Sequence, residues 1–454
     1  MFEIDPTSIV QCTGVCGIVW PIVFTLLVVF IVLTGFAYTT LLERVVLARL
    51  QQRVGPNRVG PGGFLQPLAD AVKLIFKEDI IPDQVDKPVY YLAPVLKAVP
   101  VIILFAVMPF GPDILFPWFD GNWYQLPLVL ADVNVAVLYL LAVTSLATYG
   151  MVLAGWSSNN KYAMLGGLRA SAQMISYELS MGLTLAVPIM IAGSMSLVDI
   201  VEVQQWPWEW IVFQNPLAAG VLILALFAEV SRAPFDLTEA EQELTAGYMT
   251  EYSGMKFAMF MMAEYMGMIA VGSIAIMTFF GGYNLFPMDS VPFLAPLVVI
   301  GKIVLFLFFF IWVRGTLPRI RYDRLMAFGW KILIPLALVS VVWTAIAVVL
   351  RESSMSLYIV VSSVFFLVVV GGGFAFLNAQ GDEEVEDADD YYDDPIITGD
   401  YRSIGWAVLN FVGGLIAIPF AIVNGLINGL EAFGEAAEGN SDETAIVPSD
   451  QGGD

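Results

Sequence analysis

Long uninterrupted apolar runs dominate this chain. A run of about 20 apolar residues is long enough for a helix to cross the roughly 30 Å hydrocarbon core of a bilayer. The pattern predicts nine such runs, near 19–42, 92–110, 131–154, 173–193, 216–230, 258–281, 294–313, 332–350 and 357–377. Because the runs are continuous and do not alternate with a period of two, they do not fit the strands of a membrane barrel. We therefore predict an all-α, polytopic membrane helix bundle.

Shorter patterned segments lie between and after these runs. Residues 64–81 are too short and too charged to span, but their apolar residues recur at helical spacing, which predicts an amphipathic helix in the cytoplasmic interface. The preceding residues, 53–63, are rich in Gly and Pro and predict an irregular, cationic loop. The predicted organisation is an N-terminal segment 1–18, an eight-helix domain 19–350, an extra span 357–377, an acidic linker 378–403, an apolar segment 404–433 and an acidic tail 434–454. The sequence leaves open whether 405–430 crosses the bilayer or lies on its surface.

Charge is distributed unevenly along the chain. The formal net charge is −22, but 17 acidic residues and only one basic residue, Arg402, follow Phe376, which is typical of a solvated tail. The loops near 111–130, 194–215 and 282–293 contain no Lys or Arg, whereas the alternate loops are basic. Since basic loops stay on the cytoplasmic side, we expect a multi-pass protein of a prokaryotic plasma (inner) membrane with its N-terminus outside.

Composition excludes several kinds of site. Hydrophobic residues make up 58% of the 454 positions and charged residues 14%, well below the roughly one quarter of a soluble protein. Histidine is absent, so triads, haem ligation and His-based zinc sites are excluded for this chain alone. The two cysteines, Cys12 and Cys16, cannot hold an iron–sulfur cluster without other ligands. We expect no metal site and no bound cofactor in this chain alone.

Carboxylates in or beside the apolar runs are the candidate functional residues, because an ionisable group in a membrane span is costly unless it is paired or hydrated. Three glutamates meet this description: Glu178, Glu229 and Glu264. The alternative for each is a solvated or paired residue at the membrane boundary. The loop between the fifth and sixth spans adds Asp236, Glu239, Glu241, Glu243 and Glu251. Crowded carboxylates near low-dielectric protein exchange protons near neutral pH. The alternative is a soluble acidic loop, but the apolar runs that flank the loop argue against free solvation.

A second charged loop follows the seventh run. Its sequence, WVRGTLPRIRYDRLMAFGWK, places Arg314, Arg319, Arg321, Arg324 and Lys331 around Asp323. These residues either bind anionic lipid or form bidentate pairs with carboxylates of the acidic loop or of a docked partner.

Four segments together carry a family resemblance. They are LLERVVLARLQQRVGPNRVGPGGFLQPLADAVKLIFKE, LRASAQMISYE, FAEVSRAPFDLTEAEQELTAGYMTEYSGMKFAMFMMAEY and WVRGTLPRIRYDRLMAFGWK. In order and spacing they closely resemble the quinone-chamber membrane subunit of respiratory complex I, the proton-translocating NADH:quinone oxidoreductase. The resemblance spans roughly 19–350. Departures at Val45, Ala240, Gln242 and Arg324 leave every loop carboxylate in place.

The resemblance implies an eight-helix bundle that encloses a quinone tunnel and assigns roles to charged residues. The implied tunnel residues are Glu43, Arg44, Arg53, Asp70, Arg314, Arg319 and Arg321. The implied proton-coupling residues are Glu178, Glu229, Asp236, Glu239, Glu241, Glu243, Glu251 and Glu264. No residue is assigned as catalytic.

The resemblance also implies partners. Quinone would be the substrate, with FMN and iron–sulfur clusters on partner subunits. Soluble quinone-site and iron–sulfur subunits would dock on the cytoplasmic loops, and small and antiporter-like membrane subunits would lie beside the bundle, with no nucleic acid involved. The alternatives are the homologous subunit of a membrane-bound hydrogenase or other ferredoxin- or cofactor-oxidising complex, and an autonomous proton or ion transporter. The quinone species, whether ubiquinone or menaquinone, and the proton stoichiometry stay open.

Overall fold

The described part of the chain is almost entirely helical. The computed structural model describes residues 9–11, 15–117, 123–236, 246–286, 288, 291–351, 360–368 and 371. The chain divides into two compact units, Met1–Phe366 and Leu367–Asp454. All elements named below belong to the first unit. The predicted acidic linker, the apolar segment 404–433 and the tail lie outside the described residues.

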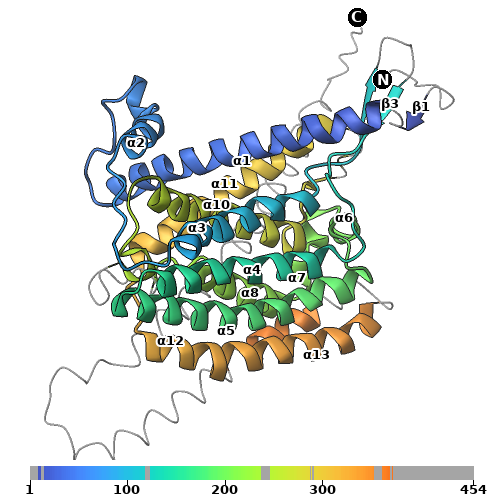
Figure 1. The fold of residues 1–454 in the computed structure, drawn as a ribbon. Coiled ribbons are helices and arrows are strands. Elements are labelled where there is room, and N and C mark those ends of the chain that lie inside the picture. The colour runs from blue at the N-terminus through green and yellow to red at the C-terminus, as the bar shows by residue number, and fades with distance from the viewer. Residues whose placement is uncertain are drawn as a thin grey trace, which may run out of the picture. The chain divides into compact units, whose positions relative to one another are not determined.

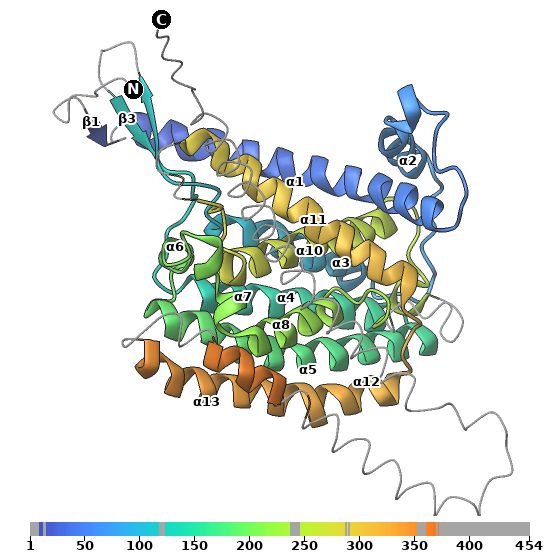
Figure 2. The same ribbon diagram turned by 180° about the vertical axis from the view of Figure 1, so that it is seen from behind.

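Long antiparallel helices form the body of the first unit (Figures 1 and 2). The helices are α1 (Val15–Leu50), α2 (Gln66–Ile75), α3 (Lys87–Ile103), α4 (Ala136–Ser157), α5 (Lys161–Ala192), α6 (Leu197–Glu202), α7 (Ile211–Gln214), α8 (Pro216–Glu229), α10 (Gly254–Phe279), α11 (Ala295–Thr316), α12 (Tyr322–Phe328) and α13 (Ile334–Arg351). Within the described residues, seven helices are long and apolar enough to cross a membrane. This confirms the predicted polytopic membrane helix bundle.

The fifth predicted span, 216–230, is shorter than the others. Helix α8 has 14 residues, which gives a length of about 21 Å at 1.5 Å per residue. Its start is fixed by Asn215, whose side chain accepts a hydrogen bond from the backbone N–H of Ala218, and by Pro216 in the first turn. Because the hydrocarbon core is roughly 30 Å thick, α8 by itself is too short to cross it.

The helices pack so that α3, α5 and α10 lie at the centre. Helix α3 packs against α4 and α10, and α5 packs against α4, α8 and α13, while α1 packs against α10 and α11. Helices α4 and α8 are apolar on all faces, as expected for helices buried among others or in lipid. Many of the apolar residues of α1 are exposed, including Ile18, Ile22, Leu26 and Phe30, which recur at a spacing of four. That side of α1 therefore presents a surface for lipid or a neighbouring protein.

The two ends of the bundle differ. At one end, which we call the sheet end, β1 (Ile9–Gln11), β3 (Trp123–Leu126) and β2 (Ile114–Pro117) form a small sheet in the order β1-β3-β2. Strand β1 is parallel to β3 and β2 is antiparallel to it. The sequence analysis did not predict this sheet. The opposite end, the charged end, carries α2, α12 and the basic loops (Figure 1).

A half-buried lysine lies at the end of α10 nearest the sheet end. The ammonium of Lys302, from α11, donates hydrogen bonds to the backbone carbonyls of Phe280, Gly282 and Asn284 at 2.7, 2.9 and 2.8 Å. It also lies 4.3 Å from the centre of the Trp210 ring. The last carbonyls of a helix lack hydrogen-bond partners within the helix. Lys302 supplies donors to the carbonyls at and just after the end of α10.

Helix α2 is shorter than the predicted amphipathic helix 64–81. A one-turn 3-10 helix, Pro61–Gly63, precedes it. Gly63 has a φ of 83°, and a Cβ there would lie 2.1 Å from the carbonyl oxygen of Pro56, so this loop folds tightly on itself. Helix α2 packs against α1 and α10. Its apolar side chains remain largely exposed, as for Leu68 and Ile75, which fits a helix that lies at a membrane surface or meets a partner.

Candidate functional site: a buried row of charged side chains

Glu43, near the end of α1, begins a row of buried ion pairs. Its side chain is buried and forms an ion pair with Arg314, the last basic residue of α11. The same Oε1 lies 3.8 Å from the guanidinium Nη1 of Arg232, which follows α8. The row thus brings together side chains from three segments that lie far apart in the sequence.

Arg232 joins Glu43 to Glu264. Its Nε lies 2.5 Å from Oε1 of Glu264, a residue of α10. Arg232 is only 4% exposed, and its guanidinium lies 4.5 Å from the centre of the Tyr265 ring. A buried charge needs a partner, because the desolvation cost is several kcal/mol per ion. Arg232 therefore holds two carboxylates in place, and they in turn stabilise Arg232.

The segment that carries Arg232 is fixed by polar contacts to its neighbours. The buried side chain of Gln173, from α5, donates to the carbonyls of Ala228 and Phe235, at 2.9 Å each. The backbone N–H of Ile320 donates to the carbonyl of Pro234 at 3.0 Å. These bonds connect the end of α8 to α5 and to the loop after α11, which sets the position of Arg232.

A partly exposed pair continues the row toward α2. Arg44 follows Glu43 directly, and its Nη1 lies 2.6 Å from Oδ2 of Asp70 in α2. The side-chain amide of Gln66 donates to the other oxygen of Asp70 at 3.0 Å. The row of charges therefore extends from the amphipathic helix at the bundle surface to the buried Glu43.

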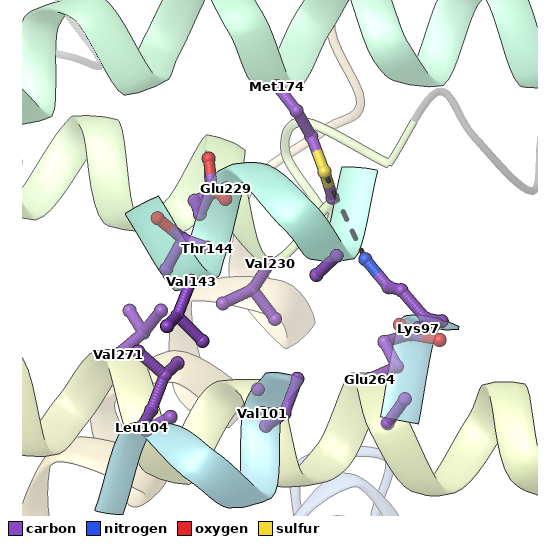
Figure 3. Close-up of a pocket in the computed structure, with 14 residues that line it drawn as sticks. Lys97, Val101, Leu104, Val143, Thr144, Met174, Glu229, Val230, Glu264 and Val271 are labelled. Atoms are coloured by element: carbon purple, nitrogen blue, oxygen red, sulfur yellow. Dashed lines mark hydrogen bonds between the residues drawn. The ribbon is translucent and has the colours of Figure 1, made fainter. Parts of the chain in front are cut away.

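A cavity lies beside Glu264, the last member of the ion-pair row. It has a volume of about 50 Å³ and is lined by Lys97 of α3, Glu229 at the end of α8, Glu264 of α10 and Thr144 of α4, together with apolar side chains (Figure 3). Glu229 is only 9% exposed, and its Oε2 has no hydrogen-bond partner among the described residues. The cavity thus places a buried carboxylate and a buried amine beside the last member of the ion-pair row.

Glu178, near the middle of α5, contacts a residue that lines this cavity. Its Oε1 accepts hydrogen bonds from the hydroxyls of Ser145 at 2.5 Å and Thr144 at 3.1 Å. Because Thr144 also lines the cavity, Glu178 is connected to it through one hydroxyl. The row thus runs from Asp70 through Glu43, Arg232 and Glu264 to the cavity, and from there to Glu178.

Several residues that the sequence analysis singled out lie elsewhere. Arg53 and Arg319 are exposed, and Arg321 forms an exposed pair with Asp323 at 3.2 Å. Asp236 is half-buried at the border of the described residues. The loop carboxylates Glu239, Glu241 and Glu243 lie outside the described residues.

Glu251 belongs to a separate polar cluster at the charged end. Its carboxylate accepts a hydrogen bond from the side chain of Asn160 at 2.6 Å, and its backbone carbonyl accepts one from the hydroxyl of Tyr90 at 2.6 Å. Tyr90 stacks on Tyr252 with ring centres 4.2 Å apart. Burial raises the pKa of Tyr252 to about 12, although its hydrogen bond with Ser157 acts in the opposite direction. The Tyr252 hydroxyl therefore stays protonated at neutral pH.

The acidic loop returns to the bundle through a close backbone contact. Gly166 of α5 faces Gly247, which follows the loop, and a Cβ at position 166 would lie 2.6 Å from the Cα of Gly247. Only a residue without a side chain fits there. This contact fixes one end of the loop against the helix that carries Glu178.

The sequence analysis missed Lys97, although the rule that identified the glutamates also applies to it. Lys97 interrupts the apolar stretch PVLKAVPVIILF inside the second predicted span. An ionisable residue in a membrane helix is a functional candidate, and basic residues were considered only in the loops. No group of metal-binding side chains is present among the described residues.

Comparisons with known proteins agree with the resemblance. The model of the NADH dehydrogenase family matches residues 23–345. The chain is 51% identical to an NADH-quinone oxidoreductase subunit of Geobacter metallireducens over 72% of this chain and 95% of the relative. It is 50% identical to an NADH-quinone oxidoreductase subunit of Protochlamydia amoebophila, over 69% of this chain and 92% of the relative. It is 46% identical to NADH-quinone oxidoreductase subunit 8 of Thermus thermophilus, over 76% of this chain and 91% of the relative. The chain belongs to the NADH dehydrogenase family.

Proposed function

We propose that this chain is the membrane subunit of a proton-translocating NADH:quinone oxidoreductase that admits the quinone and carries the acidic path linking its reduction to proton movement. The names of the relatives support membership in this enzyme complex. The observation that carries the finer proposal is the row of charged side chains from Asp70 and Glu43 to Glu178. Buried charges of this number are costly in a membrane protein and mark ion or proton pathways.

The quinone would enter at the charged end, between the membrane surface and the beginning of the row. Helix α2 presents exposed apolar side chains there, including Leu68, Val72 and Phe76, and it contacts α1 and α10. A quinone has an apolar tail and a polar ring, so an apolar helix beside the Arg44–Asp70 pair suits both parts. This placement assigns Glu43, Arg44, Asp70 and Arg314 to the quinone tunnel.

Coupling would follow from the ion pairs of Arg232. Quinone reduction takes up electrons from the partner subunits and protons from its surroundings, and a proton that leaves a side chain near Glu43 would change the charge there. Glu43 and Glu264 share Arg232, so a change in the charge of one carboxylate alters the stabilisation of the other. Glu264 lines the same cavity as Glu229, and protons would pass from there to Glu178 and on to neighbouring membrane subunits.

This proposal also assigns orientation and partners. The charged end would face the cytoplasm of a prokaryote and receive the soluble quinone-site and iron–sulfur subunits, which would carry FMN and the clusters. The N-terminus would lie outside. The exposed apolar side of α1 would face lipid or a neighbouring membrane subunit. The loop carboxylates Glu239, Glu241 and Glu243 would belong to the same proton path.

The proposal is tested with the whole enzyme in inverted membrane vesicles. Glu178→Gln and Glu229→Gln remove a titratable group and keep the shape of the side chain. We expect each to lower NADH-driven quinone reduction and proton translocation together by at least about tenfold, because a broken path stalls coupled turnover. The matched control is Glu202→Gln, which changes an exposed glutamate of α6 and should leave both rates unchanged. Wild-type rates of both activities in fully assembled Glu178→Gln and Glu229→Gln enzymes would contradict the proposal.

A further inference from the structure

Lys97 is a buried amine whose surroundings do not satisfy it. It is only 8% exposed, in the middle of the bundle. The partners of its Nζ within the described residues are sulfur atoms, Sδ of Met151 at 3.5 Å and Sδ of Met174 at 4.0 Å. Figure 3 shows the contact with Met174 as a dashed line. A thioether is a weak acceptor, so these contacts do not balance the cost of burying an ammonium group. The charge of Lys97 must be stabilised by something else in the cavity.

The cavity supplies two carboxylates. Glu229 and Glu264 line the same space as Lys97, and they come from two different helices. The Oε2 of Glu229 is buried with no hydrogen-bond partner among the described residues. The charges of both carboxylates act on Lys97, and the charge of Glu178 acts on Glu229. A buried carboxyl group that lacks a direct partner and a buried amine that touches only sulfur thus share one cavity.

The cavity has room for water between them. A water molecule needs roughly 10 to 15 Å³ of such volume and two to four polar partners. The cavity volume of about 50 Å³ therefore holds about three to five water molecules. The ammonium offers three donors, each carboxylate offers acceptors, and the hydroxyl of Thr144 lies on the wall. A water-filled cavity would satisfy each of these buried polar groups.

The pairing of the buried charges around the cavity indicates the role of Lys97. Glu43 pairs with Arg314, and Glu264 pairs with Arg232. Glu229 and Glu178 remain, and Lys97 is the cation of the cavity itself. Without Lys97, Glu229 would face a neighbouring carboxylate with no counter-charge, and such a group takes up a proton and becomes neutral.

We propose that Lys97 is a positioning residue of the proton path, which acts through cavity water as the counter-charge of Glu229 and so sets how many protons Glu229, Glu264 and Glu178 hold together. This inference rests on the proposed function, because it describes the same path. It adds a residue and a hydrated site that lie outside the tunnel and coupling residues assigned above.

The test compares Lys97→Met with Lys97→Arg in the intact, purified enzyme. Methionine keeps the length of the side chain and removes the charge, whereas arginine keeps the charge. We expect the infrared spectrum of Lys97→Met at neutral pH to show one more protonated carboxyl group per enzyme than wild type. We also expect coupled proton translocation to be about tenfold lower, a factor that corresponds to about 1.4 kcal/mol. Lys97→Arg should restore the wild-type carboxyl spectrum.

Two controls separate charge from packing. Met151→Leu conserves volume next to Lys97 and leaves the charge in place, so its carboxyl spectrum should match that of wild type. Lys97→Met/Glu229→Gln removes both charges and should return the number of protonated carboxyls to the wild-type value. If Lys97→Met does not assemble, the double variant still should, because it leaves no unpaired charge.

The outcomes distinguish this inference from the proposed function. A wild-type carboxyl spectrum and wild-type proton translocation in Lys97→Met would overturn the role of Lys97, even where Glu178→Gln stops translocation. A change of the same size in Met151→Leu, or failure of the double variant to assemble, would overturn it as well. Wild-type activity in both Lys97→Met and Glu178→Gln would contradict the proposed function itself.

Discussion

Arg232 gives the sharpest prediction about stability, because one buried cation joins two carboxylates. The variant Arg232→Met removes the guanidinium and keeps a long apolar side chain. It leaves Glu264 without its partner at 2.5 Å, whereas Glu43 keeps its ion pair with Arg314. Glu264 therefore loses most of the electrostatic stabilisation that Arg232 provides.

The magnitude follows from the burial of the pair. Arg232 is 4% exposed, and Glu264 is also almost fully buried. Breaking a buried ion pair by removing one partner costs about 3 to 5 kcal/mol, whereas replacing both partners with neutral groups is often close to neutral. We expect Arg232→Met to destabilise the subunit by about 3 to 5 kcal/mol. Arg232→Met/Glu264→Gln should recover at least about 2 kcal/mol of that loss, because no unpaired charge remains at Glu264.

The assay is the midpoint of thermal inactivation of the assembled enzyme. The expected order of stability is wild type, then the double variant, then Arg232→Met. The control Arg321→Met breaks the exposed pair with Asp323 and should not change the midpoint measurably. A double variant that is no more stable than Arg232→Met would refute the interpretation that Arg232 and Glu264 form a buried ion pair.

Three further predictions follow from single contacts. Lys302→Met removes the ammonium that binds three carbonyls at the end of α10 and should lower stability by at least about 2 kcal/mol. The measurement is the thermal midpoint, which should fall in Lys302→Met and be partly restored in Lys302→Arg. Gly166→Ala forces a Cβ to within 2.6 Å of backbone atoms and should destabilise the protein by about 1 to 3 kcal/mol. Gly220→Ala is the control, because a Cβ there meets nothing within 4 Å, and it should leave stability unchanged. Thr144→Val/Ser145→Ala removes both hydroxyl donors to Glu178 and should raise the number of protonated carboxyls in the infrared spectrum; an unchanged spectrum would contradict that contact.

The spans were predictable because lipid imposes a simple condition on sequence. A helix that crosses a bilayer needs about 20 apolar residues, and the apolar runs record this length directly. Helix α8 shows the limit of the rule. Its run, 216–230, was predicted as a span although it is the shortest of the nine, and the helix matches it to within one residue. The packing of so short a helix appears only when the neighbouring helices are in place.

The candidate residues were predictable as types but not as partners. The cost of a charge in a membrane identified Glu178, Glu229 and Glu264 from their context alone. Which cation faces which carboxylate depends on packing, since Glu43 and Arg314 are separated by 271 positions. The sheet was missed because its three strands have only three or four residues each, too few for an alternating pattern to stand out.

The central claim is that the ion pairs from Glu43 to Glu264 and the cavity form one continuous buried path. A density map of the assembled enzyme in lipid, at a resolution that shows water, tests it most directly. The claim predicts the Glu43–Arg232–Glu264 pairs intact and ordered water between Glu264, Lys97 and Glu229. A cavity filled by lipid or closed by apolar side chains, with these pairs separated, would contradict it.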